Sequence, residues 1–369
     1  MNAALGGRPL LRMRRGAALS PWRRRGNRRL AVLLASATLL LVGVVLALCV
    51  GPSGIGIGRL LEIALAAVGL GDGPPAGDVE RGVLLHVRAP RIVLGAAVGA
   101  ALALAGAALQ ALLRNPLVEP GLVGTTAGGT LGAVLWIVFG AGAVGGVLGG
   151  FGLAVAAFLG ALGATVLVVA FAGSRGRVDN AVLILVGVAL TAIFSAGTGF
   201  ALFLADDQAL RDVTFWSLGS LSRATWPALA VVLPCLGAAS AVLIARAQVL
   251  DALLLGEAEA RALGVRVDVE KRVLVAASAL AVAAAVGLTG SIGFVGLIVP
   301  HGARMLVGAA HRALLPVAAL LGAAALVLAD AGARTFAAPA ELPIGILTAA
   351  VGGPCFLVLL FARRARMAG

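Results

Sequence analysis

The sequence contains no tyrosine, and its 369 residues include one lysine, three histidines and three cysteines. Metal sites need several ligands at short spacing, whereas Cys49, Cys235 and Cys355 lie far apart within apolar runs. An enzyme site needs a nucleophile or base beside a group that orients it, and the sequence offers no such combination. Lys271 follows Glu270 and not the glycine of a phosphate-binding loop, so we predict neither a metal site nor a nucleotide site.

Charge is also scarce, because charged residues make up 12% of the chain and hydrophobic residues 61%. The mean hydropathy is +1.07, which exceeds what a water-soluble core and surface require, so most of the chain must face lipid. Backbone groups in lipid have to pair within their own segment, and a helix needs about 20 apolar residues to cross roughly 30 Å of hydrocarbon. The predicted fold class is an all-α polytopic membrane protein.

Ten apolar segments are candidates for membrane spans. They lie at 30–50, 92–113, 121–140, 146–172, 181–205, 226–245, 272–290, 293–308, 313–330 and 342–362. The segment 293–308 is short and contains Pro300, His301 and Arg304, but without it the basic C-terminal residues would lie outside. We therefore predict about ten transmembrane helices. They form a transmembrane domain at 30–362, which is preceded by a basic cytoplasmic tail at 1–29 and followed by a basic C-terminal tail at 363–369.

Basic residues are distributed unevenly between the two sides of this arrangement. With the N-terminus inside, 22 Arg and Lys residues lie on inner segments and 7 on outer segments, although nine of the 22 belong to the first tail. This excess follows the positive-inside rule and predicts a multi-pass protein of the cell membrane with both termini cytoplasmic. The formal charge of +13 therefore reflects topology. No basic face interleaved with aromatic residues is present, so the bilayer is a predicted partner and nucleic acid is not.

Many of the 52 glycines recur at a spacing of four residues, which allows two membrane helices to approach closely. The pairs are Gly95/Gly99, Gly128/Gly132, Gly145/Gly149 and Gly146/Gly150. The segments 120–124 and 293–296 have weakly similar sequences, and they begin two predicted spans, the first from inside and the second from outside. This similarity is consistent with an inverted repeat or with chance.

One stretch, 250–268, is strongly charged in an otherwise apolar chain. Glu257, Glu259 and Arg261 surround small apolar residues, with Gly256 and Gly264 at the two ends. Each charge would cost about 2.5–3.5 kcal/mol at the bilayer centre, so the segment must lie in the cytosol. A solvated linker is one interpretation. The length of the loop favours the other, a helix that docks a cytosolic partner.

Several motifs now indicate a family. They are Arg88-Ala-Pro-Arg91, Gly106-Ala-Ala-Leu-Gln110, Arg114-Asn-Pro-Leu117 with Pro120-Gly121, Trp216-Ser-Leu-Gly-Ser220, Gly256-Glu-Ala-Glu-Ala260 with Leu263-Gly264, the run from Gly290 to His301, and Glu341-Leu-Pro-Ile-Gly345. In order and spacing they resemble the FecCD-type permease subunits of ATP-binding-cassette (ABC) importers for ferric siderophores, haem and cobalamin. The resemblance runs from about residue 88 to 361.

This resemblance implies the fold of a type II importer permease that binds no cofactor itself. Its partners would be a cytosolic ABC ATPase dimer that uses ATP and Mg²⁺, an extracytoplasmic substrate-binding protein, and a second permease copy, identical or paralogous. In the family the loop between the sixth and seventh spans supplies the helix that couples to the ATPase. The matching residues are Gly256, Glu257, Ala258, Glu259, Ala260, Arg261, Leu263 and Gly264.

The resemblance also implies a contact with the binding protein through Arg88, Arg91 and Arg334. Salt bridges at such a wet rim are worth only about 0–1 kcal/mol each and mainly orient the partner. The alternative is that these arginines anchor helices at the membrane interface.

Two further sets of residues are candidates for the transport path and its gate. Thr191, Ser195 and Thr198 form a polar stripe along one helix, which would line a pore or would pair helices through hydrogen bonds. Arg177, Asp179 and Asn180 lie in the inner loop 174–180, where relatives have a cytoplasmic gate, although a plain positive-inside loop explains them as well.

The predicted function is import of a metal chelate by alternating access, driven by a separate ATPase, in a subunit that is not itself an enzyme. Ferric siderophore is the expected cargo, and cobalamin or haem are the alternatives. A secondary transporter driven by an ion gradient is a further alternative, but the spans contain no chain of carboxylates or histidines for proton coupling.

Overall fold

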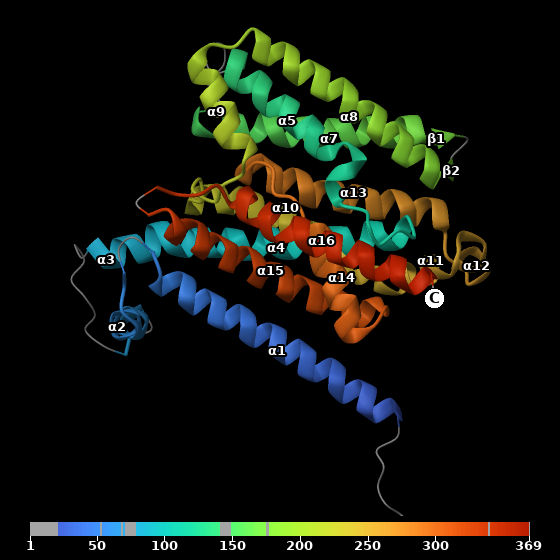
Figure 1. Cartoon of the computed structure of the whole chain (residues 1–369), viewed down its shortest axis with the longest axis horizontal. Coiled ribbons are helices and arrows are strands. Elements are labelled where there is room, and N and C mark those ends of the chain that lie inside the picture. The colour runs from blue at the N-terminus through green and yellow to red at the C-terminus, as the bar shows by residue number, and fades with distance from the viewer. Residues whose placement is uncertain are drawn as a thin grey trace, which may run out of the picture.

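The computed structural model describes residues 21–51, 54–67, 69–70, 79–140, 149–174, 177–338 and 340–368. Nearly all of the regular structure in these residues is helical (Figure 1). The elements are α1 (Pro21–Cys49), α2 (Ile57–Ala67), α3 (Val79–Gly82), η1 (Val83–Arg88), α4 (Ala89–Leu112), η2 (Pro120–Val123), α5 (Thr125–Leu135), η3 (Trp136–Gly140), η4 (Gly149–Phe151), α7 (Gly152–Ala172), β1 (Gly173–Ser174), β2 (Arg177–Val178), α8 (Asn180–Phe203), α9 (Asp207–Ser217), α10 (Trp226–Ala245), α11 (Ala247–Leu255), α12 (Glu257–Ala262), α13 (Val267–Thr289), α14 (Val295–Val307), α15 (His311–Phe336) and α16 (Ile344–Ala368).

Among the described residues, seven helices are long and apolar enough to cross a membrane: α1, α3 to α4 as one continuous helix, α7, α8, α10, α13 and α15. Three shorter apolar helices, 125–140, 295–307 and 344–358, account for the remaining predicted spans. The all-α class and the set of about ten membrane helices are therefore confirmed. The boundaries differ, because α1 begins at Pro21 within the predicted basic tail and α16 continues to Ala368.

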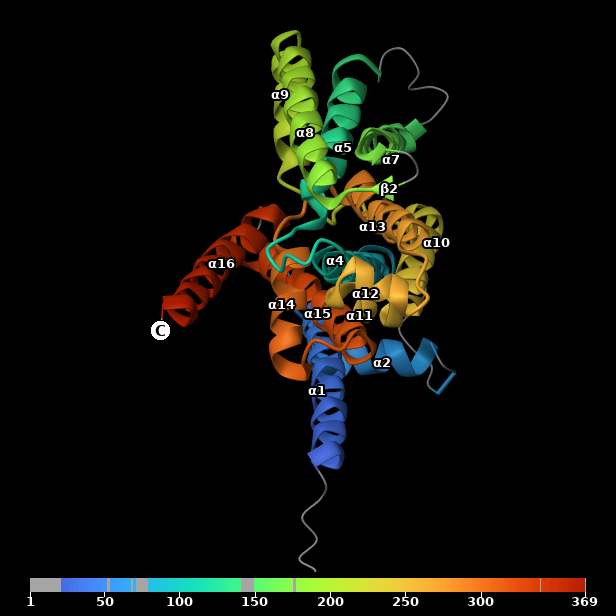
Figure 2. The same ribbon diagram turned by 90° about the vertical axis from the view of Figure 1, so that its right-hand side faces the viewer.

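The helices differ greatly in how much of their surface they bury. In an apolar stretch of 18 residues, 78% of the residues are buried in the continuous helix α3 to α4 and in α13, against 17% in α1 and in α8. The two central helices carry long runs of alanine and glycine, which let neighbours pack closely on every side. In Figure 2, α16 projects from this block and α8 lies in a group with α5, α7 and α9, and apolar side chains on both α8 and α16 remain exposed.

Close glycine contacts join two pairs of these helices. A Cβ added at Gly99 of α4 would lie 2.2 Å from the carbonyl oxygen of Gly322 in α15, and one at Gly128 of α5 would lie 2.5 Å from that of Gly160 in α7. Gly132 likewise faces Ala156, so the predicted close approach is confirmed at Gly95/Gly99 and Gly128/Gly132. The pairs Gly145/Gly149 and Gly146/Gly150 begin outside the described residues.

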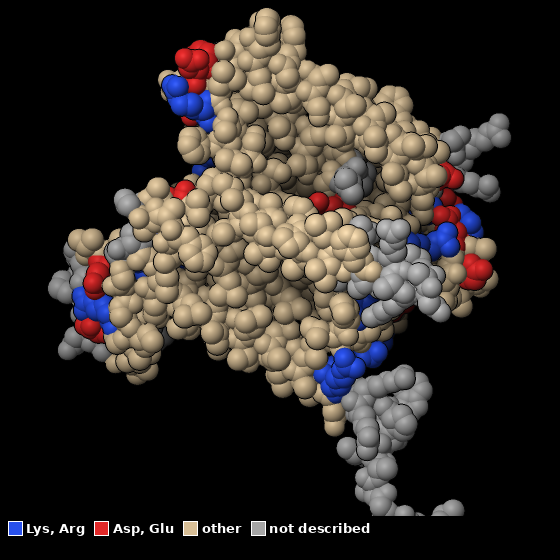
Figure 3. Space-filling view, viewed as in Figure 1, with Lys and Arg blue, Asp and Glu red and all other residues tan. Residues whose placement is uncertain are grey.

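The two ends of the bundle carry different elements (Figure 1). One end holds α11, α12, the β1–β2 hairpin, the start of α1 and the end of α16, whereas α2, α3 and α9 lie at the opposite end. We call these the inner end and the outer end, after the sides predicted from the sequence. Figure 3 shows that most charged side chains on one face gather at the two ends, with a mostly uncharged surface between them.

Candidate coupling site and gate

The predicted coupling segment forms two short helices that meet at Gly256. The backbone of Gly256 has φ 136° and that of Gly264 has φ 84°, values that strongly favour glycine, so α12 begins and ends at residues that permit a sharp turn. The Glu259 carboxylate folds back toward Gly256 at the start of α12. Ala260 is fully buried and anchors the helix to the bundle. The helix expected between the two glycines is therefore present, at the inner end.

Apolar side chains line the outward face of these two helices. Leu255 is 65% exposed and Leu263 is 66% exposed, and Leu254, Ala258 and Ala262 are exposed beside them. We call these five residues the inner patch. Exposed apolar groups beside dense charge are typical of a protein-binding surface. The sequence predicted the helix between the two glycines but missed α11, which supplies Leu254 and Leu255, and docking of a partner here stays a prediction.

Ion pairs connect this segment to the beginning of α13. Lys271 pairs with Glu257, while Arg261 lies 3.4 Å from Glu257 and 3.6 Å from Asp268. Lys271 is 1% exposed. It was not among the site residues predicted from the sequence. Its position in an apolar helix beyond a charged loop was the only sequence signal available for it.

The predicted gate is a tight hairpin followed by the start of α8. Asp179 caps that helix, accepting hydrogen bonds from the backbone N–H groups of Ala181 at 2.8 Å and Val182 at 3.1 Å. These two bonds, and to a smaller extent the positive charge of Lys271, hold the pKa of the Asp179 carboxyl below its usual range. The side chain of Arg177 lies outside the described residues.

Asn180 ties the same helix start to the end of α4. Its side-chain Nδ2 donates to the carbonyl oxygen of Leu112 at 2.9 Å. Because Leu112 is the last residue of α4, the beginning of α8 is held against the central helix of the bundle. Asp179 and Asn180 thus lie at the inner end, and their role in a gate stays a prediction.

The three outer arginines lie inside the chain. Arg91 pairs with Asp330 at 2.7 Å and with Glu341 at 2.9 Å, and Arg334 pairs with the other oxygen of Asp330 at 3.0 Å. Arg88 donates to the carbonyl oxygen of Leu48, at the end of α1. All three arginines are at most 5% exposed, so they do not form the wet rim implied by the resemblance. Their contact with a binding protein stays a prediction.

The predicted polar stripe of α8 is divided between two environments. Thr191 is half-buried beside Gly124 and donates to the carbonyl oxygen of Gly187 in its own helix at 2.7 Å. Ser195 is exposed, and Thr198 is half-buried. The stripe is therefore only partly covered in the single chain, and its role in a path stays a prediction.

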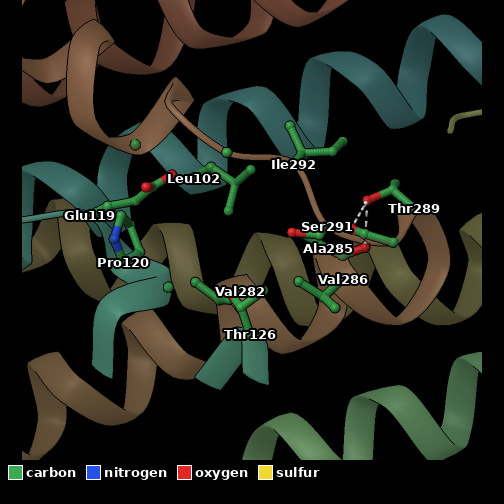
Figure 4. Close-up of a pocket in the computed structure, with 14 residues that line it drawn as sticks. Leu102, Glu119, Pro120, Thr126, Val282, Ala285, Val286, Thr289, Ser291 and Ile292 are labelled. Atoms are coloured by element: carbon green, nitrogen blue, oxygen red, sulfur yellow. Dashed lines mark hydrogen bonds between the residues drawn. The ribbon is translucent and has the colours of Figure 1, made fainter. Parts of the chain in front are cut away.

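Motifs far apart in the sequence meet at two junctions. At the first, Gln110 of α4 donates to the carbonyl oxygens of Gly296 at 3.3 Å and Leu297 at 3.2 Å in α14. The Glu119 carboxylate accepts the backbone N–H of Phe294 at 2.6 Å. A cavity of about 170 Å³ lies here, with Glu119 and Pro120 at one side and Thr289 and Ser291 at the other (Figure 4).

The second junction lies toward the outer end and is made by the backbone. The N–H of Ser220 donates to the carbonyl oxygen of Thr289 at 2.8 Å, and that of Ile344 donates to Gly219 at 3.0 Å. The motifs at 216–220, 290–301 and 341–345 thus hold one another in place. This mutual support gives a physical reason for their shared occurrence in one sequence.

Comparison with known proteins adds the identity of the fold. The model of the FecCD transport family matches residues 39–362. The chain belongs to the FecCD transport family. The cobalamin import system permease protein BtuC of Halobacterium salinarum is 45% identical over 280 residues, which cover 76% of this chain and 73% of that protein. The hemin transport system permease protein HmuU of Yersinia pestis is 39% identical over 290 residues, or 78% of this chain and 85% of that protein.

A solved structure extends the match to three dimensions. It is assigned to the metal-chelate type of ABC transporter in an inward-facing conformation, and it matches with a TM-score of 0.78 at 35% identity. The match covers 90% of this chain and 99% of that chain. This FecCD chain is accordingly a permease subunit of an ABC importer, and the family predicted from the motifs is confirmed.

Proposed function

We propose that the chain moves a chelated metal ion into the cytoplasm by alternating access, driven by a cytosolic ATPase dimer that docks on the inner patch. The observation that carries this proposal is the inner patch itself: exposed leucines on two helices that turn at Gly256 and Gly264. A short rigid helix passes a rigid-body movement between subunits, whereas a flexible linker would absorb it. The chain has no nucleotide site of its own in this proposal, and ATP and Mg²⁺ belong to the partner.

The remaining partners follow from the same proposal. The inner end faces the cytoplasm with both termini, and a substrate-binding protein docks at the outer end, where Arg88, Arg91 and Arg334 would act by holding the docking surface in shape. A second permease copy, identical or paralogous, covers the exposed apolar faces of α8 and α16, with Thr191, Ser195 and Thr198 toward the path. Arg177, Asp179 and Asn180 form the cytoplasmic gate.

Ferric siderophore is the proposed cargo. The cargoes named for the relatives, cobalamin and hemin, and the metal-chelate class of the similar structure all contain a chelated metal ion. Uptake assays with the assembled importer and its own binding protein would compare a ferric siderophore, haem and cobalamin. Saturable uptake of the siderophore alone supports the proposal, and uptake of haem or cobalamin alone replaces it.

Co-purification tests the docking surface directly. The chain is co-expressed with a candidate ATPase, and Leu263→Asp or Ala258→Arg is introduced into the inner patch. We expect retention of the ATPase to fall at least tenfold, which corresponds to about 1.4 kcal/mol of binding free energy. Leu70→Asp is the matched control. Leu70 is also an exposed leucine, at 73%, but it lies beside α2 at the outer end, away from the inner patch. Assembly and ATP-dependent uptake that survive scrambling of residues 256–264 would overturn the proposal.

The energy source separates this proposal from the secondary transporter. An ABC importer stops when ATP is depleted and continues when the ion gradient is collapsed. Uptake that stops with the gradient and ignores ATP depletion would favour the secondary transporter instead.

A further inference from the structure

Lys271 holds an unusual position in this chain. It is the only lysine beside 28 arginines, and it lies in the second turn of α13 at the inner end. Its side chain is 1% exposed, so its charge has lost nearly all contact with water. A buried charge of this kind persists only where other charged or polar groups compensate for the lost hydration.

One acidic residue pairs with this charge and a second lies within its electrostatic reach, and the two come from the two predicted functional elements. Lys271 pairs with Glu257, the first residue of α12. Its positive charge also acts on the carboxylate of Asp179, which caps the beginning of α8. The backbone agrees with this placement, because α13 packs against both α12 and β2. Lys271 therefore stands between the coupling helix and the gate.

The chemistry of lysine suits a shared contact. An ammonium group is a compact charge with three donors on a flexible stem, so it can turn between two carboxylates. A guanidinium is a planar fork that pairs best with one carboxylate at a time. Glu257 also has a second partner in Arg261 at 3.4 Å, so Glu257 keeps an ion pair when its contact with Lys271 lengthens.

We propose that Lys271 is a positioning residue that passes movement of α12 to the start of α8 by exchanging its ammonium group between Glu257 and Asp179. When the partner ATPase pulls α12 away, Glu257 turns to Arg261 and Lys271 moves fully to Asp179. The cap at the beginning of α8 then shifts relative to Leu112, to which Asn180 is bound. This inference rests on the proposed function and adds the side-chain contact that connects docking to the gate.

The test measures the gate in the complete importer. The three native cysteines are replaced by alanine, and Ala181→Cys places a single thiol in the exposed first turn of α8. The chain is assembled with its ATPase and second permease copy in lipid nanodiscs. The rate of maleimide labelling is then compared without nucleotide and with ATP plus vanadate. We expect the two rates to differ at least about threefold with Lys271 present.

Three variants separate a relay from a structural contact. Lys271→Met should bring the ratio of the two rates to about one while the complex still assembles. Asp179→Asn keeps an acceptor for the helix cap but removes the charge, and should have the same effect. The double variant Lys271→Glu, Glu257→Lys restores the pair between α12 and α13 but repels Asp179, so its ratio should also stay near one. Recovery of the ratio in the double variant would overturn the relay.

A matched ion pair supplies the control. Arg246 pairs with Glu270 at 2.7 Å, also on the first turns of α13, but it lies at the junction of α10 and α11 and contacts neither α12 nor the gate through this pair. Arg246→Met should keep the ratio of the unchanged chain, and its collapse would overturn the specificity claimed for Lys271. An unchanged ratio in Lys271→Met or in Asp179→Asn overturns the relay alone. Failure of the reporter chain itself to bind the ATPase contradicts the proposed function instead.

Discussion

Both ends of the bundle use ion pairs to connect helices, but the network around Asp330 at the outer end is buried, whereas the pairs of Arg246 and Arg261 at the inner end are partly exposed. At the outer end Asp330 bridges Arg91 and Arg334, and these three side chains are 3–6% exposed. At the inner end Arg246 is 37% exposed and Arg261 is 46% exposed. The charges of the Asp330 network are isolated from water, whereas those of Arg246 and Arg261 remain within its reach.

This difference separates a fixed end from a movable one. Removing one member of a buried pair leaves an uncompensated charge and costs about 3–5 kcal/mol, while an exposed pair contributes about 0–1 kcal/mol. The outer network joins α1, α4 and α15 into one block, since Arg334 also donates to the carbonyl oxygen of Ala47 at 3.1 Å. The inner pairs can exchange partners at little cost, which suits the end where we propose that the ATPase docks.

The largest expected effect comes from breaking the outer network. Asp330→Ala leaves the guanidinium groups of Arg91 and Arg334 buried without their shared carboxylate. We expect a loss of about 3–5 kcal/mol in the free energy of unfolding, measured by denaturation of the purified chain in detergent. Glu270→Ala, which breaks an inner pair, should cost about 1 kcal/mol or less. Equal losses at the two ends would remove the distinction between them.

The second effect concerns packing within the outer block. Gly99→Ala places a methyl group where only 2.2 Å separates the new Cβ from the carbonyl oxygen of Gly322. The helices α4 and α15 must move apart, at a cost of about 1–3 kcal/mol. Gly237→Ala is the control, because nothing lies within 4 Å of its added Cβ. The same denaturation assay should show little change for that control, and tolerance of Gly99→Ala would mean that the block is not rigid.

The third effect tests the turn at the inner end. Gly264 has φ 84° and open space around its added Cβ, so Gly264→Ala is strained by backbone conformation alone. We expect a local cost of about 1–2 kcal/mol. Because α12 ends at this turn, ATP-dependent uptake should fall strongly while the melting temperature changes only slightly. A variant that loses stability but keeps normal uptake per ATP hydrolysed would show that the turn at Gly264 has no part in coupling.

The smallest effect is local to the start of α8. Asp179→Ala removes the acceptor for the amides of Ala181 and Val182, so amide hydrogen exchange in this turn should become several-fold faster, whereas Asp179→Asn should change it little. The pKa of Asp179 is lowered on folding, so its contribution is present above the usual Asp range and is lost as pH falls through the lowered value. The protection of these amides from exchange should therefore persist at neutral pH. A loss of protection near neutral pH would contradict the assignment of Asp179 as the cap.

The set of membrane helices was predictable because bilayer thickness fixes the length of a span. Even the short segment 293–308 appears as α14, with Pro300 inside the helix. The burial of the outer arginines was not predictable, since Arg91 and Asp330 are 239 residues apart and only the folded chain brings them together. Lys271 was missed for the same reason, because its partners lie on α12 and at the start of α8.

Sidedness of the inner patch is the most direct test of the account. A cysteine introduced at Ala258 in the cysteine-free chain is labelled with an impermeant maleimide in right-side-out and inverted membrane vesicles. The account predicts labelling in inverted vesicles only, and protection when the ATPase is bound. Labelling of the same residue from the exterior would contradict it.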